Sequence, residues 1–149
     1  MARARLPTLS LAIQYPGGKQ QAPTRPQVRR WVRAACALPA TIAVRFVAND
    51  EGRQLNVDYR GKDYATNVLS FSYRNDDVIE GDLAICIAVV DAEATQQQKP
   101  LEAHYAHLIV HGMLHLQGYD HETGQTDALR MEQREREILA SLGIPDPYL

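Results

Sequence analysis

Apolar residues recur along this chain with two periods, and the two kinds of stretch alternate. An apolar residue at every second position indicates a strand with one buried face, whereas a period near 3.6 indicates an amphipathic helix. The expected strands are residues 9–15, 41–47, 67–73 and 81–90. The expected helices are residues 26–38, a short helix through Leu55 and Val57, then 93–99, 101–117 and 126–142.

Individual residues indicate where some of these helices begin and end and which of their positions face inward. Pro26 suits the first turn of a helix and Pro39 ends it. Asn49 or Asp50 is expected to cap the short helix that follows. In the last helix Glu132 and Arg136 are expected to form an exposed pair one turn apart. The inward positions of the first and last helices are expected to be Val28, Trp31, Val32, Ala35, Leu38, Met131, Ile138, Leu139 and Leu142.

The order of elements predicts an α/β (α+β) fold with a mixed, mostly four-stranded sheet covered by helices. The strand at 81–90 is apolar on both sides from Leu83 onward, which places it at the centre of the sheet. Helix 101–117 is expected to be the central helix. A chain of 149 residues forms one domain with a proper core, so residues 1–149 are taken as a single domain in which 1–8 form a flexible tail.

The composition of the chain indicates the cellular compartment in which the protein is expected. The sequence contains no run of 18 apolar residues, so no membrane span is expected. The basic N-terminus lacks the apolar stretch of a signal peptide. Cys36 and Cys86 lie in apolar segments without a Cys-x-x-Cys pairing, which is typical of free thiols in a reducing compartment. A cytoplasmic protein is expected.

The charges are unevenly distributed along the chain. Residues 1–75 hold 12 Lys and Arg against 4 Asp and Glu, whereas residues 76–149 hold 4 against 14. A local basic surface able to hold a polyanion is therefore plausible despite the net charge of −2. Scattered solvated charge is an equally good interpretation.

The candidate chemistry lies in the histidines, all five of which fall between residues 104 and 121. His111 and His115 are four residues apart, so on a helix they share one face. Gly118 is free to take positive φ and end that helix, which allows the chain to return His121 as a third ligand. Three imidazoles with a fourth position for water are typical of a catalytic zinc site. The sequence thus predicts one Zn²⁺ per chain on His111, His115 and His121.

The alternatives to this zinc site are specific. A His pair at this spacing also occurs on ordinary amphipathic helices, although burying imidazoles in this apolar segment is costly without partners. The motif resembles that of zinc peptidases, but Gly112 stands where those enzymes have the Glu that acts as general base. His104 and His107 are expected to lie outside the ligand set, and His107 is left to orient the site, hold substrate or make a structural bond.

The segment His111-Gly-Met-Leu-His-Leu-Gln-Gly-Tyr-Asp-His121 resembles the signature H-G-x-L-H-L-x-G-Y-D-H of the YbeY family of bacterial endoribonucleases. Every fixed position matches. The blocks 59–63, 66–71 and 81–85 resemble further parts of that family, so the resemblance covers about residues 40 to 142.

The resemblance implies a zinc-dependent, single-strand-specific endoribonuclease in ribosomal RNA maturation, at the 3′ end of 16S rRNA, and in ribosome quality control. It implies RNA, the ribosome or small-subunit proteins as partners. It also implies catalytic roles for His111 and for Arg60, whose guanidinium can hold a phosphate with two donors. The general base is left open between the activated water, Asp120 and the RNA 2′-hydroxyl.

Two departures and two rival functions remain. Asn67 stands where the family pattern has Asp, and Ser72 stands where Pro often follows the Phe. If the family Asp steadies a cation, that role is weakened here. The rivals are another metal-dependent hydrolase such as a peptidase, and a non-catalytic ribosome-associated factor with a structural metal. An open coordination position would favour a nuclease over the latter.

Overall fold

A computed structural model describes residues 7–73, 77–119 and 124–149 of the chain. Its strands are β1 (Leu9–Gln14), β2 (Ala40–Val47), β3 (Val68–Ser72) and β4 (Ile79–Cys86). Its helices are α1 (Arg25–Ala35), α2 (Asn49–Arg60), α3 (Ile87–Gln96), α4 (Leu101–Leu116) and α5 (Gln125–Ser141). Of the tail expected over residues 1–8, residues 1–6 lie outside this description. Thr8 is tied to the sheet, because its carbonyl accepts the Ala40 N–H.

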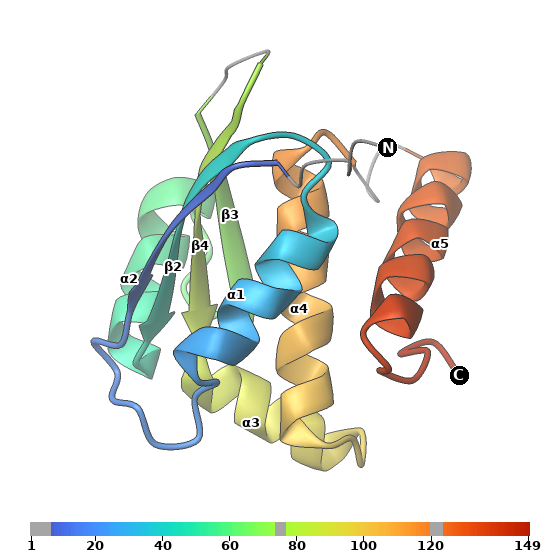
Figure 1. The fold of residues 1–149 in the computed structure, drawn as a ribbon. Coiled ribbons are helices and arrows are strands. Elements are labelled where there is room, and N and C mark those ends of the chain that lie inside the picture. The colour runs from blue at the N-terminus through green and yellow to red at the C-terminus, as the bar shows by residue number, and fades with distance from the viewer. Residues whose placement is uncertain (1–6, 74–76, 120–123) are drawn as a thin grey trace, which may run out of the picture.

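The four strands form one mixed sheet in the order β1-β2-β4-β3. β1 pairs parallel to β2, β2 pairs parallel to β4, and β3 returns antiparallel to β4. The mixed sheet and the central place of the strand predicted from Gly81 onward are confirmed. Helices α1 and α4 cover one face with α5 outside α4, whereas α2 lies on the other side (Figure 1). Among the described residues no helix is long and apolar enough to cross a membrane.

The alternation along the strands decides which residues meet which layer. In β4, Leu83 faces α4, and its register partners Val44 and Ser70 share that face. Asp82 and its partners Ala43 and Phe71 point to the opposite face, where α2 lies. The side chains on the α4 face of the sheet are therefore separated from those on the α2 face by the sheet itself.

Helix α4 lies very close to the sheet at two glycines. A Cβ on Gly112 would lie 2.8 Å from Cδ2 of Leu83, and one on Gly81 would lie 2.6 Å from Cδ2 of Leu116. Both distances are well inside van der Waals contact. A side chain at position 112 would therefore require the buried Leu83 to shift, and a glutamate, as in a zinc peptidase, would also place its charge against this apolar contact.

Several expected boundaries were wrong. The strand expected at 81–90 ends at Cys86, where α3 begins, because a short apolar run fits a buried strand and a buried helix equally well. Helix α1 ends at Ala35, so Leu38 lies beyond it and is exposed. The N-cap of α2 is Ala48, and neither Asn49 nor Asp50 takes that place.

The pair expected between Glu132 and Arg136 is replaced by a tertiary one. Arg136 forms an ion pair with Asp146, 2.9 Å away in the C-terminal segment. An i,i+4 pair gains only a few tenths of a kcal/mol, roughly 0.2–0.5, so a longer-range partner easily displaces it.

Candidate metal and RNA site

Helix α4 presents three histidines on one face. Their spacing of four residues places His107, His111 and His115 in successive turns. The rings of His111 and His115 lie 4.8 Å apart between centroids at 81°, and those of His107 and His111 lie 6.2 Å apart. The structure therefore brings two of the three predicted ligands together. His121 lies outside the described residues, as does Asp120. Gly118 takes φ 95° just after α4, as the sequence predicted.

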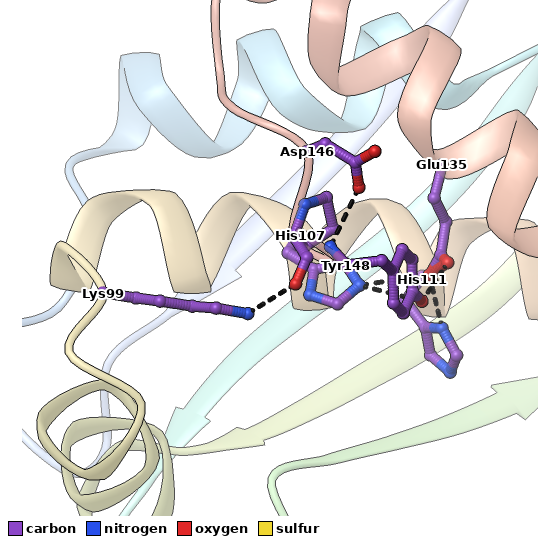
Figure 2. A network of polar contacts seen from close by, with 7 residues as sticks. Lys99, His107, His111, Glu135, Asp146 and Tyr148 are labelled. Atoms are coloured by element: carbon purple, nitrogen blue, oxygen red, sulfur yellow. Dashed lines mark hydrogen bonds and ion pairs between the residues drawn. The ribbon is translucent and has the colours of Figure 1, made fainter.

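A buried carboxylate reaches this row from α5. Glu135 is 0% exposed, and its Oε1 lies 2.7 Å from Nδ1 of His111 and 3.3 Å from Nε2 of His107 (Figure 2). Burial by itself raises the pKa of Glu135, but hydrogen bonds from His107, His111 and Tyr148 outweigh it and lower the pKa to about 2. Glu135 is thus ionised and accepts the proton on Nδ1 of His111.

The C-terminal segment closes over this carboxylate. The Tyr148 hydroxyl donates to Oε2 of Glu135 at 2.5 Å, and its ring packs edge-on against His107 (Figure 2). Burial, followed by the nearby Glu135 carboxylate, raises the pKa of Tyr148, so this hydroxyl keeps its proton and remains a donor. The segment is anchored by Lys99, which donates to the carbonyl of Pro147 at 2.8 Å. Glu135 therefore has partners on both oxygens.

Glu135 is not among the site residues predicted from the sequence. The sequence nevertheless indicates that Glu135 is buried. It lies four residues after Met131 and three before Ile138, on the stripe of the last helix predicted to face inward. An acidic residue in an apolar stripe requires a partner, since burying an unpaired charge is very costly. That partner lies 24 residues earlier in the chain and is not marked by any local pattern.

His107, His111 and Glu135 form a group that could bind a metal ion, with potential ligand atoms all within 4.8 Å of one another. Two ligands of a tetrahedral zinc ion, with bonds of about 2.0–2.2 Å, lie roughly 3.3–3.5 Å apart. The 2.7 Å between His111 and Glu135 is shorter and matches a hydrogen bond. This geometry leaves His111 able to bind a metal through Nε2 only, with Glu135 orienting the ring.

Arg60 lines the same cleft as His111 and His115. The cleft has a volume of about 740 Å³ and runs between the end of α2, strand β3 and helix α4. Arg60 is the last residue of α2, and Gly61 ends that helix by taking φ 68°. The helix end thus places an exposed guanidinium in the cleft that contains the two imidazoles. The residues with a hydroxyl group that line the cleft are Tyr59, Thr66, Ser70 and Ser72.

Three other polar residues lie on the elements around this site. Asp82 accepts a hydrogen bond from the Tyr73 hydroxyl at 2.6 Å on the α2 face of the sheet. His104 is buried, with its Nε2 3.0 Å from Glu93. Asn67 lines the cleft and donates to the same Glu93. Neither Asp82 nor His104 belongs with the paired imidazoles.

Comparison with known proteins agrees with this arrangement. A family model described as endoribonuclease YbeY matches residues 19–143, which extends the likeness upstream of residue 40. A protein named endoribonuclease YbeY from Paraburkholderia phymatum is 53% identical over 152 residues, covering 97% of this chain and 99% of the relative. A relative of the same name from Methylibium petroleiphilum is 52% identical and covers 99% of both chains.

A solved structure supports the fold. The solution structure of TM1509 from Thermotoga maritima superposes with a TM-score of 0.57 at 24% identity, covering 89% of this chain and 91% of the other. The matched family segment holds the α4 histidines, Arg60 and Glu135. On the extent of the family match and the identity to these relatives, the chain belongs to the family described as endoribonuclease YbeY.

Proposed function

We propose that this chain is a zinc-dependent endoribonuclease that cuts single-stranded RNA during ribosomal RNA maturation, including 3′-end processing of 16S rRNA, and ribosome quality control. Membership of the family supports the reaction class. The observation that carries the proposal for this chain is the single cleft in which His111, His115 and Arg60 meet. A cationic group and a metal site within one cleft can together stabilise the charge that develops when a phosphodiester is cleaved.

The metal ligands proposed are His111, His115 and His121, with one ion per chain. The residues described fit this role, because neutral imidazole nitrogens suit zinc and two of the rings are adjacent. When bound, zinc would supply a Lewis acid that polarises a phosphoryl oxygen or lowers the pKa of a water. Glu135 would hold the proton of His111 on Nδ1 and keep the ring in place, as carboxylates behind metal-binding histidines commonly do.

Arg60 would bind the phosphate. A guanidinium offers two parallel donors that match two phosphate oxygens and can stabilise the charge that develops in the transition state. Arg60 lies at the end of α2 and is exposed in the cleft, so it could reach an RNA strand that lies along β3. RNA is the proposed substrate, with the ribosome or small-subunit proteins as partners. The two cysteines are free thiols, in keeping with a cytoplasmic protein.

The test is RNA cleavage by the untagged, metal-loaded protein. A labelled single-stranded RNA, the same RNA annealed to its complement and a DNA of the same sequence are compared before and after chelation. We expect cleavage of the single-stranded RNA only, loss on chelation and recovery with added zinc. The substitution H115A should abolish cleavage, and R60A should reduce it far more than the exposed control K62A. Cleavage that survives both chelation and H115A would remove the metal mechanism.

A further inference from the structure

An exposed aromatic ring lies beside the proposed phosphate-binding residue. Tyr59 immediately precedes Arg60 at the end of α2 and is 67% exposed. Its ring packs edge-to-face against Phe71 of β3, with 4.7 Å between centroids and 60° between planes. This contact fixes one side of the Tyr59 ring on the sheet edge while most of its surface remains accessible.

Tyr59 also lies where two cavities meet. The cleft with the histidines and a second cavity of about 610 Å³ share the lining residues Tyr59, Phe71 and Ser72. The second cavity lies between α2 and the α2 face of the sheet, and its floor includes Ala43 and Ala84. Its volume is within the roughly 300–1,000 Å³ of small-molecule sites. A nucleic-acid strand that passes through the first cleft can therefore reach past the edge of β3 and place one of its groups in the second cavity.

The charges of the second cavity indicate which group this would be. Arg45 is paired with Glu51 at 2.7 Å, and Asp82 accepts a hydrogen bond from the Tyr73 hydroxyl. With its one arginine already paired and a carboxylate nearby, the described lining of this cavity is unsuited to a phosphate. An uncharged, flat group with donors on its edge would find an aromatic ring, small apolar side chains and a carboxylate acceptor there. A nucleobase is such a group, because it is flat, uncharged and carries hydrogen-bond donors on its edge.

We propose that Tyr59 is a stacking platform for an unpaired base of the RNA, next to the phosphate held by Arg60, and that the second cavity receives this base. The proposal rests on the proposed ribonuclease function and adds how the strand is held. Stacking on an aromatic side chain is tolerant of sequence but requires a base that is free of its partner. Tyr59 would thereby contribute to a preference for single strands.

The experiment measures equilibrium binding of a 2′-O-methyl RNA of about ten nucleotides, within the length that one single-strand-binding module covers, to the full-length, metal-loaded protein. The 2′-O-methyl groups prevent cleavage by attack of the 2′-hydroxyl, and a gel after the measurement checks that the RNA is intact. Y59A is expected to weaken binding roughly 5- to 150-fold, the range that corresponds to losing one stacked base. Y59F and Y59W should bind as tightly as the parent, since only the aromatic face is needed. Y59L keeps an apolar contact with Phe71 but has no ring, and it should bind as weakly as Y59A.

Tyr64 provides the matched control. It is 55% exposed, follows α2 and is absent from the described lining of both cavities. Y64A should bind RNA within about twofold of the parent, since exposed positions away from a contact couple weakly to it. A series of RNAs with a single abasic position locates the stacked base: one position should weaken binding to the parent, and that loss should vanish in Y59A.

The outcomes separate this proposal from the ribonuclease function. If the parent protein cleaves and binds RNA but Y59A and Y59L bind as tightly as the parent, the stacking platform is refuted and the nuclease stands. Equal losses in Y59A and Y64A would also refute it, since they would indicate a general effect of exposed aromatics. If the parent neither binds nor cleaves RNA, the ribonuclease proposal itself fails.

Discussion

The side-chain amide of Asn67 donates to both carboxylate oxygens of Glu93, at 3.1 and 3.3 Å. Its own carbonyl oxygen accepts the N–H of Val68 at 2.7 Å and so starts strand β3. Glu93 in turn lies 3.0 Å from Nε2 of the buried His104. The Asn found where the family pattern has Asp is thus the donor that links β3 to α3 and α4.

We expect N67D to destabilise the protein at neutral pH. An aspartate would lose the donated hydrogen bonds and place a second carboxylate against Glu93. Together these effects should cost about 1–3 kcal/mol in the free energy of unfolding. Urea denaturation of the two proteins measures the difference.

The double variant N67D/E93Q is the control for this mechanism. The second substitution, Glu93→Gln, supplies an amide donor that faces the new carboxylate, so much of the lost stability should return. If N67D is as stable as the parent at neutral pH, the bond between Asn67 and Glu93 does not hold β3 in place.

Removal of the charge on Glu135 is expected to weaken zinc binding. E135Q keeps the size of the side chain but replaces the carboxylate that accepts the Nδ1 proton of His111. Loss of a carboxylate behind a metal-binding histidine typically costs roughly 10- to 100-fold in affinity. Competition with a chromophoric chelator measures that affinity. E137Q removes the same charge from the exposed side of α5 and should leave affinity unchanged; equal affinities for E135Q and the parent would contradict the orienting role.

His107 and His115 allow the two candidate ligand sets to be distinguished. Both lie on one face of α4, one turn to either side of His111. With the proposed ligands, H115A should lose bound zinc, whereas H107A should keep a full equivalent with at most a few-fold weaker affinity. Elemental analysis of protein purified without a His-tag gives the metal content. The reverse result would assign the ion to His107, His111 and Glu135.

Enlarging Gly112 is expected to disturb the packing of α4 on the sheet. In G112A the new Cβ lies 2.8 Å from Cδ2 of the fully buried Leu83. Overpacking of this kind costs about 1–3 kcal/mol, more than the roughly 1 kcal/mol gained by replacing glycine with alanine in a helix. G112E should not yield stable protein, because it adds a buried charge.

The size swap L83A/G112A tests the cause. Shortening Leu83 opens the space that the new methyl group needs, so the two changes should be less damaging together than the sum of the single variants. If the losses in the free energy of unfolding, measured by urea denaturation, simply add in the double variant, Leu83 is not the side chain that a Cβ at position 112 overpacks.

Much of the fold follows from local periodicity. The alternating stretches near β1 and β2, the second half of β4 with apolar residues on both faces, and the long apolar helix α4 are each recognisable from the local sequence. The spacing of His111 and His115 likewise fixes that they share a helical face, because helix geometry relates residues four apart wherever the helix lies. Gly118 marks the end of that helix for the same local reason.

Other features depend on which surfaces pack together. Residues 87–90 continue the apolar run of β4, and only the packing of α3 decides that they are helical. Glu135 and Tyr148 reach His111 because α5 and the C-terminal segment lie against α4, and Arg60 joins His111 because β3 bridges α2 and α4. In the longer periodic stretches, the local pattern determines the type of element and its buried face. The partner of that face is chosen by burial and hydrogen bonding summed over the whole domain, which no short stretch of sequence contains.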